Sequence, residues 1–366
     1  MYKIIASLIA TFIIALVITP IVRHLSFKLG AVDNPNARRV NRIPMPTMGG
    51  LAIFIAFNTT NFFLLREQYP LGQLFALFVA QCVIIFTGMI DDIYELSPRQ
   101  KILGITLAAL VVYFLAHIKM TTITLPFLGV ISLGWLSLPL TLIWILAITN
   151  AVNLIDGLDG LATGVAIIAL STSAITGYFF LNVTSTFVSI MMATLVAALL
   201  GFLPYNFNPA KIYLGDTGSL FIGFMISVFA LYGLKNATFI TVIIPVIILG
   251  VPITDTIYAI LRRLLNKKPI SQADKHHLHH RLMQMGLTHR QTVLVIYGIA
   301  LIFSFISLMY PLSNLWGSIL LTIATLVGLE LFVEAIGLVG DDRQPLLNGI
   351  KKVVLRLSRA VNKSKK

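Results

Sequence analysis

The chain has 366 residues, of which 57% are hydrophobic and only 11% are charged, and its mean hydropathy is +0.91. Since an ordinary soluble protein is about one quarter charged, this composition excludes a soluble enzyme, a fibrous protein and a disordered chain. The formal net charge is +13, and the single cysteine, Cys82, excludes both an internal disulfide and a zinc site of four cysteines. We therefore expect a polytopic membrane protein.

Uncharged apolar segments recur along the whole chain, and a membrane-spanning helix needs about 20 apolar residues. Three of the uncharged runs are too long for one span and are divided at Pro, Gly or Asn. The sequence predicts an all-α integral membrane protein in which residues 1–340 form one transmembrane domain. About eleven helices are expected, at 4–22, 48–65, 71–90, 102–118, 136–152, 161–181, 186–203, 217–234, 236–261, 291–310 and 315–337.

The basic residues indicate the orientation of this domain. With eleven spans, 23 of the 27 Lys and Arg residues fall on the side of the C-terminus. Because cytoplasmic loops are rich in Lys and Arg, we expect the N-terminus outside, the C-terminus in the cytoplasm and the protein in the cell (cytoplasmic) membrane. Eleven of the 14 acids fall on the same side. Several of them end a span, where acids are costly and usually functional.

The first two cytoplasmic loops, residues 23–47 and 91–101, carry bases and acids respectively. Arg38, Arg39 and Arg42 are first of all topology signals, although they precede Gly49-Gly50 closely enough that a phosphate contact stays open. In the second loop Asp91 and Asp92 directly follow an apolar span. A solvated helix cap is the simpler interpretation of two adjacent acids, but their position at the membrane favours a functional site.

The next two loops, residues 153–160 and 204–216, combine acids with amides. Asn153, Asp156 and Asp159 follow an i, i+3, i+6 spacing, which in a helix would place them on one side. In the following loop we expect Asp216 to cap the next span. Capping does not account for Asn206 in the same loop, so a ligand site is favoured there.

The longest loop, residues 262–290, holds four of the seven histidines within five positions, 276–280. Such a cluster is typical of metal or phosphate binding. Lys275 and Arg281 beside it favour a pyrophosphate over zinc. The basic tail, residues 341–366, has apolar residues at helical spacing and seven bases between positions 350 and 366. Either an amphipathic helix on anionic lipid or a solvated tail would fit this pattern.

Together the loops gather carboxylates, amides, bases and histidines at one membrane surface. Mg²⁺ binds through carboxylates, phosphate oxygens and waters, and cations neutralise a pyrophosphate during substitution at phosphorus. The residues alone predict a Mg²⁺-dependent phosphoryl or glycosyl-phosphate transfer, without identifying the sugar or the nucleotide. A secondary transporter is the alternative from another class, although transporters hold such acids near the bilayer midplane.

Five segments resemble the polyprenyl-phosphate N-acetylhexosamine-1-phosphate transferase superfamily, glycosyltransferase 4. They are Met48 to Gly50, Asp91-Asp92, Asn150 to Ala162, Asn206 to Asp216, and Asp274 to Arg281. The order His-Leu-His-His at 277–280 resembles the WecA and TagO branch rather than MraY. The stretches 32–35, 91–94 and 288–292 look most like the Gram-positive TagO proteins.

The resemblance implies an enzyme that transfers GlcNAc-1-phosphate from UDP-GlcNAc to undecaprenyl phosphate. The products would be undecaprenyl-pyrophosphoryl-GlcNAc and UMP, in the first membrane step of teichoic acid or another surface glycan. The implied cofactor is Mg²⁺, with Mn²⁺ as a substitute, and the implied partners include membrane lipid and no nucleic acid. The donor could instead be another UDP-N-acetylhexosamine, such as UDP-MurNAc-pentapeptide. The resemblance also leaves open a homodimer, and either direct or covalent transfer.

The resemblance also implies residue roles. Asp216 and Asn153 would hold the metal, and Asp91, Asp92 and Asp156 would be catalytic. The first acidic pair would handle the lipid phosphate, either with one acid as a base or as a positioning group, since a phosphate monoester is already largely ionised at neutral pH. The implied substrate-binding residues are Arg42, Thr47, Lys101, Asp159, Asn206, His277, His279, His280 and Arg281.

Overall fold

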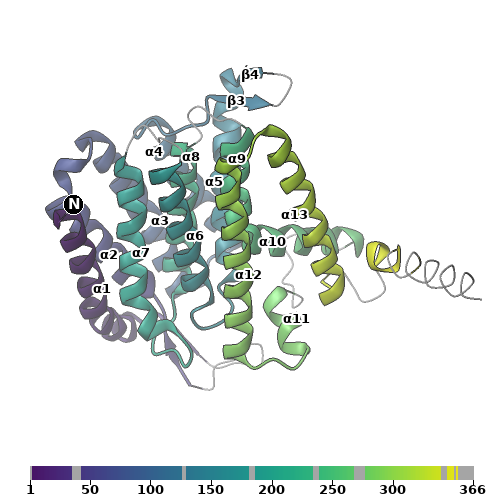
Figure 1. Cartoon of the computed structure of the whole chain (residues 1–366). Coiled ribbons are helices and arrows are strands. Elements are labelled where there is room, and N and C mark those ends of the chain that lie inside the picture. The colour runs from purple at the N-terminus through teal and green to yellow at the C-terminus, as the bar shows by residue number, and fades with distance from the viewer. Residues whose placement is uncertain are drawn as a thin grey trace, which may run out of the picture.

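The structure, a computed structural model, describes residues 2–34, 43–125, 129–180, 186–233, 239–267, 277–338, 344–349 and Lys352 (Figure 1). The expected all-α membrane fold is confirmed. The principal helices are α1 (Tyr2–Leu29), α2 (Gly49–Thr59), α3 (Leu71–Tyr94), α4 (Pro98–Phe114), α5 (Ser137–Ile155), α6 (Leu161–Phe179), α7 (Thr186–Asn206), α8 (Gly215–Gly233), α9 (Phe239–Ile248), α10 (Gly250–Leu265), α11 (Leu278–Gln284), α12 (His289–Met309) and α13 (Leu315–Ile336). Arg38, Arg39 and Arg42 lie outside the described residues, and so does the basic tail apart from 344–349 and Lys352.

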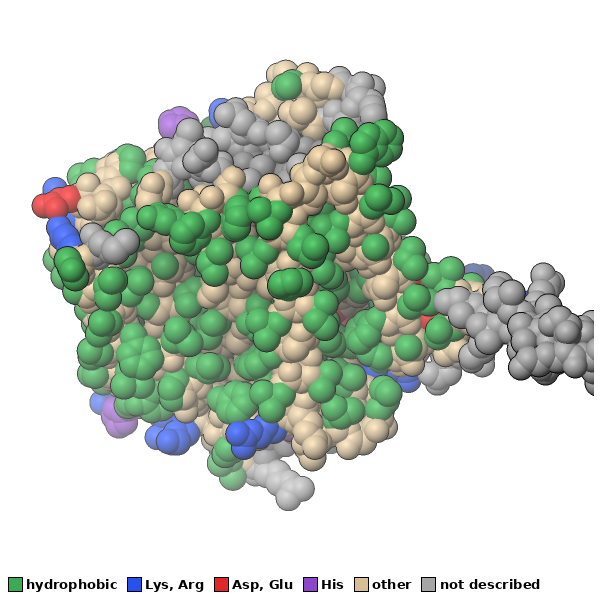
Figure 2. Space-filling model, in the orientation of Figure 1, with side chains coloured by type: hydrophobic (Ala, Val, Ile, Leu, Met, Phe, Trp, Pro, Cys, Tyr) green, Lys and Arg blue, Asp and Glu red, His purple; other side chains and the backbone are tan. Residues whose placement is uncertain are grey.

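Eight of the described helices are long and apolar enough to cross a membrane, namely α1, α3, α5 with the preceding turn, α6, α7, α8, α12 with the following turn, and α13. Two shorter helices occupy the second and fourth predicted spans. They are α2, which continues as a π-helix to Leu64, and α4, which has 17 residues and begins with a Ser97–Gln100 capping box. Figure 2 shows apolar side chains over the middle of the bundle and Lys, Arg and His side chains along its lower edge.

The ninth predicted span, 236–261, is wrong as one continuous helix. The chain breaks at Leu249 into α9 and α10, and α10 lies across the other helices (Figure 1). At the break, a Cβ on Gly250 would come within 2.7 Å of the Phe303 ring, so only glycine lets α10 start so close to α12. The polar residues of α10, Asp255 among them, explain why this segment does not continue through hydrocarbon.

Helix α8 is the centre of the bundle. Of its apolar window 89% is buried, against 11% for α13 at the periphery. Close packing depends on glycines: a Cβ on Gly50 of α2 would lie 2.1 Å from the Cα of Gly218, and one on Gly88 of α3 would lie 2.4 Å from the Cα of Thr217. The glycine at position 50 thus has a packing role, because it lets α2 touch α8.

Two short hairpins complete the fold. Strands β1 (Val32–Asp33) and β2 (Met45–Pro46) pair antiparallel after α1. Strands β3 (Thr122–Leu125) and β4 (Gly129–Ser132) pair antiparallel with Leu125 opposite Gly129, at the upper end of the bundle in Figure 1.

Candidate active site

A cavity of about 1220 Å³ opens where α3, α5 and α7 end and where α4 and α8 begin. Segments far apart in the sequence meet here, as the loop pattern predicted. Of the residues implied by the resemblance, Thr47, Asp91, Asp92, Lys101, Asn153, Asp156, Asp159, Asn206, Asp216, His279 and His280 line it.

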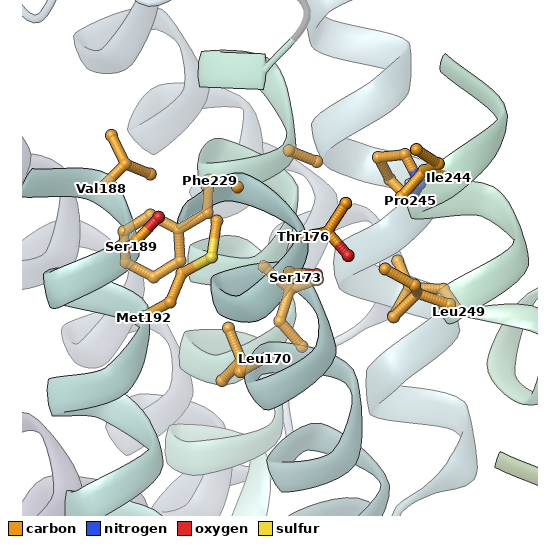
Figure 3. A pocket seen from close by; sticks show the side chains of 14 residues that line it. Leu170, Ser173, Thr176, Val188, Ser189, Met192, Phe229, Ile244, Pro245 and Leu249 are labelled. Carbon is orange, nitrogen blue, oxygen red and sulfur yellow. The ribbon is translucent and has the colours of Figure 1, made fainter. Parts of the chain in front are cut away.

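A second cavity, of about 50 Å³, lies between α6, α7, α8 and α9 (Figure 3). Its lining is mainly apolar, with Leu170, Met192 and Phe229 facing the space together with the hydroxyls of Ser173 and Thr176. This cavity is too small for a nucleotide and lacks the charged groups of the larger one.

Asp92 caps α8 from a different helix. Its carboxylate accepts hydrogen bonds from the backbone N–H of Asp216 at 2.9 Å, and from the backbone N–H and the hydroxyl of Thr217 at 3.1 and 2.6 Å. A Cβ on Gly215, whose φ is +70°, would lie 2.5 Å from this carboxylate. The expectation that Asp216 caps α8 is therefore wrong, because Asp92 already binds the free N–H groups of that helix start.

The Asp216 carboxylate is thus free to face the cavity, where two other elements contact it. Asn153 at the end of α5 donates to Oδ1 of Asp216 and, at 2.8 Å, to the Ser219 hydroxyl. The Lys101 ammonium of α4 lies 3.2 Å from Oδ2 of Asp216 and also pairs with Asp91. Asp91 is only 4% exposed. One lysine therefore bridges two carboxylates that would otherwise repel each other.

Asp156 follows the end of α5, where its backbone N–H donates to the Asn153 carbonyl at 3.2 Å, but no hydrogen bond or ion pair joins its carboxylate to a residue that the structure describes. Because α5 ends at Ile155, the three-residue spacing of Asn153, Asp156 and Asp159 does not continue as one helix. Burial, and then the negative charges of Asp216, Asp92 and Asp159, raise the pKa of Asp156 well above its usual value. No counter-charge pairs with the Asp156 carboxylate in the described part of the chain.

This arrangement fits a divalent cation. Asp216 and Asn153 offer oxygen ligands, Asp156 offers an unpartnered carboxylate, and a cation among them would relieve the repulsion that raises the pKa of Asp156. The described residues contain no group of three His, Cys, Asp or Glu side chains arranged to hold a metal by themselves.

Asp159 and Asn206 mainly shape the loops beside the cavity. Asp159 accepts from the Asn208 amide at 2.9 Å and from the Ala210 N–H at 3.1 Å. Asn206 is 3% exposed, accepts from Thr163 at 2.7 Å and donates to the Ile212 carbonyl at 3.2 Å. The Thr47 hydroxyl likewise donates a hydrogen bond within the protein, to the Ala31 carbonyl at 3.0 Å.

The histidine loop divides into two parts. His279 and His280 line the cavity, with ring centroids 4.2 Å apart. Burial, and then the charge of His280, lower the pKa of His279 to about 3, so its imidazole is neutral at pH 7. Neither His277 nor Arg281 is among the cavity-lining residues, and Arg281 donates to the Gly337 carbonyl at the end of α13.

The sequence-based set omits several residues of the cavity lining, His289 among them, and it omits Asp255, which lies outside the lining and contacts His277. His289 lines the cavity and accepts a 2.9 Å hydrogen bond from the Asp159 N–H. Asp255 of α10 is 2% exposed and pairs with His277. A signal existed for both: His289 lies in the stretch 288–292 that resembles TagO, and Asp255 is an acid inside an apolar segment.

The site and fold define a membrane-embedded transferase, and the comparisons agree. The profile described as glycosyl transferase family 4 matches residues 74–234, and the chain belongs to this family. It is 44% identical over 358 residues to a protein of Bacillus subtilis described as a probable undecaprenyl-phosphate N-acetylglucosaminyl 1-phosphate transferase, covering 97% of this chain and 98% of that protein.

More distant relatives carry two different substrate names. A decaprenyl-phosphate N-acetylglucosaminephosphotransferase of Mycobacterium tuberculosis is 36% identical, over 75% of this chain and 74% of that protein. A phospho-N-acetylmuramoyl-pentapeptide-transferase of Clostridium beijerinckii is 33% identical, over 82% of this chain and 94% of that protein. These relatives are therefore named for two different sugars.

Proposed function

We propose that the chain transfers GlcNAc-1-phosphate from UDP-GlcNAc to undecaprenyl phosphate, which yields undecaprenyl-pyrophosphoryl-GlcNAc and UMP. The observation that carries this proposal is the convergence of Asp91, Asp156 and Asp216 with Lys101 on one cavity. The 44% identity to the Bacillus subtilis protein supports the choice of sugar and lipid. The product would enter teichoic acid or another surface glycan.

Mg²⁺ is the cation proposed for this site, with Asp216 and Asn153 as its protein ligands and Asp156 beside it. When bound, it would neutralise pyrophosphate oxygens during the transfer. The Lys101 ammonium pairs with Asp91 and lies 3.2 Å from Asp216, and it would bind a phosphate oxygen. Asp91 would orient Lys101, and Asp92 would hold α8 so that Asp216 faces the substrate.

We further propose that the cavity faces the cytoplasm of a cell whose cytoplasmic membrane holds the protein. Support comes from the bases counted on the side of the C-terminus, 23 of 27. A UDP-sugar is made in the cytoplasm, so this orientation would give the cavity direct access to its donor.

The test is UMP release by the purified full-length chain, with UDP-GlcNAc, undecaprenyl phosphate and Mg²⁺ or Mn²⁺. Release that requires both the lipid phosphate and the cation is expected. UDP-MurNAc-pentapeptide in the same assay decides the donor, because the preferred donor outcompetes the other. An absence of UMP with every donor and both cations would overturn the proposal, and turnover without a cation would remove the metal site.

A further inference from the structure

Asp255 is a buried acid that the transfer chemistry above does not use. It lies on α10, outside the cavity lining, and it is 2% exposed. Its Oδ1 accepts from the Leu278 N–H at 2.8 Å, and its Oδ2 lies 2.8 Å from Nδ1 of His277. Because an ionised carboxylate only accepts hydrogen bonds, this contact places a proton on Nδ1 of His277.

A series of ring contacts leads from His277 to His279 and His280, which line the cavity. The His277 and His279 rings are stacked, with centroids 6.0 Å apart and planes 3° apart, and His280 follows at 4.2 Å from His279. A Cβ on Gly157 would lie 2.6 Å from Nε2 of His279, so this ring rests against the loop that carries Asp156. Asp255 is thus joined to the acidic loop through two imidazoles.

The short helix that carries these histidines is held at both ends. Asp255 binds the N–H of its first residue, Leu278, and Arg281 in its last turn binds the Gly337 carbonyl. Replacing a buried hydrogen-bonded pair by apolar side chains of the same shape is often nearly neutral or even stabilising. Both carboxylate oxygens of Asp255 contact the start of α11, at His277 and Leu278. We therefore assign this contact to the placement of α11 rather than to the stability of the fold.

We propose that Asp255 and His277 are positioning residues, which hold His279 and His280 at the mouth of the acidic cavity with a fixed His277 tautomer. This inference rests on the proposed function for its activity test. It adds residues on α10 and α11 that act through their neighbours rather than by touching the substrate.

The decisive variant is Asp255→Asn in the full-length chain. The amide keeps the shape but loses the charge, and it can offer an N–H where His277 needs an acceptor. The kcat for UMP release is expected to fall roughly 10- to 100-fold, as for lost partners of metal-bound histidines, with the KM for UDP-GlcNAc changing less. His277→Gln is expected to give a similar loss, and the double variant no further loss, because the two residues act as one unit.

Glu334→Gln is the matched control. Glu334 of α13 is also 2% exposed, and its carboxylate accepts two hydrogen bonds, from the backbone N–H groups of Leu346 at 3.0 Å and Leu347 at 2.8 Å, but it does not line the cavity. This variant is expected to keep wild-type kcat. Wild-type kcat in Asp255→Asn, or an equal loss in Glu334→Gln, would overturn the inference while leaving the proposed function intact.

A measurement without turnover separates the two proposals. In ¹⁵N-histidine-labelled protein, the NMR signals of His277 should show a proton on Nδ1, and Asp255→Asn should remove that signature and shift the signals of His279 and His280. If the wild-type chain releases no UMP, the proposed function fails and this spectrum still decides the positioning. Unchanged His279 and His280 signals in Asp255→Asn would overturn it.

Discussion

The two ends of the helix bundle hold acids under opposite conditions. At one end Glu67 pairs with Lys3 at 2.6 Å, and the two side chains are 78% and 55% exposed, so water screens both charges. At the other end Asp91 is nearly buried, Asp216 is 29% exposed, and Asp156 lies beside them without a partner among the described residues. Buried acids that lie close together repel one another, so such a cluster indicates a ligand site. An exposed ion pair in water indicates no such site.

The largest expected effect is that of Asp216→Asn, tested against Glu67→Gln at the opposite end. Removal of the cavity carboxylate should lower kcat by at least about 10²-fold, the effect of losing one group that stabilises the transition-state charge. Glu67→Gln makes the same chemical change in solvent and should leave kcat unchanged. Initial rates of UMP release measure both. Equal rates in the two variants would contradict the distinction between the ends.

A second contrast compares glycines at the two ends. In Gly50→Ala the new Cβ would meet the Cα of Gly218 at 2.1 Å, so α2 and α8 must separate, at a cost of roughly 1–3 kcal/mol or more. Gly72→Ala, at the start of α3, meets no atom within 4 Å and should be neutral or slightly stabilising. Thermal unfolding in detergent measures both, and an unaffected Gly50→Ala protein would argue against the α2–α8 contact.

A third contrast concerns acid stability. In the unfolded chain His279 binds a proton near pH 6.5, whereas burial, and then the charge of His280, lower its folded pKa to about 3. The unfolded state therefore binds more protons between these values, and stability falls as the pH falls from about 6.5 toward 3. At pH 5 the loss is roughly 2 kcal/mol. His279→Gln should reduce the difference in unfolding free energy between pH 7 and pH 5 by that amount.

The control for this pH dependence is Gly72→Ala at the opposite end, which adds or removes no titratable group. The difference in unfolding free energy between pH 7 and pH 5 should therefore be the same as in the wild-type chain. If His279→Gln shows the same difference in unfolding free energy between pH 7 and pH 5 as the wild-type chain, the His279 imidazole titrates as it does in water.

The smallest expected effect is that of Lys3→Met. The Lys3–Glu67 pair is mostly exposed and screened by water, so its loss should hardly change the unfolding free energy, and should change it even less in high salt. Denaturant unfolding at low and high salt measures this. A larger loss would mean that the end of the bundle that holds Lys3 and Glu67 depends on this pair.

Much of the fold could be predicted because hydrocarbon demands long apolar helices, and α1, α3, α5 to α8, α12 and α13 lie where such segments were expected. The boundaries were less predictable. Helix α3 continues to Tyr94 rather than stopping at 90, because Lys101 and the Leu96 N–H bind Asp91 while the start of α8 binds Asp92. The break between α9 and α10 depends on the close contact of Gly250 with Phe303, which no local pattern reveals.

The candidate site divides in the same way. Residue type and position at a span end were enough to find Asp91, Asp156 and Asp216, since acids beside hydrocarbon are costly wherever they occur. The roles of His277 and Arg281 were not predictable, because their partners, Asp255 and Gly337, lie 22 and 56 residues away.

The sequence by itself determined that the chain is an all-α membrane protein and which of its span ends carry acids, because hydropathy and residue type are local properties. Only the tertiary structure decided which acid does what. Asp92 accepts the N–H groups of α8, and Asp216 is thereby released to the cavity, although both are acids at the ends of spans. The two residues are 124 positions apart, and only the packing of α3 against α8 sets the distance between them.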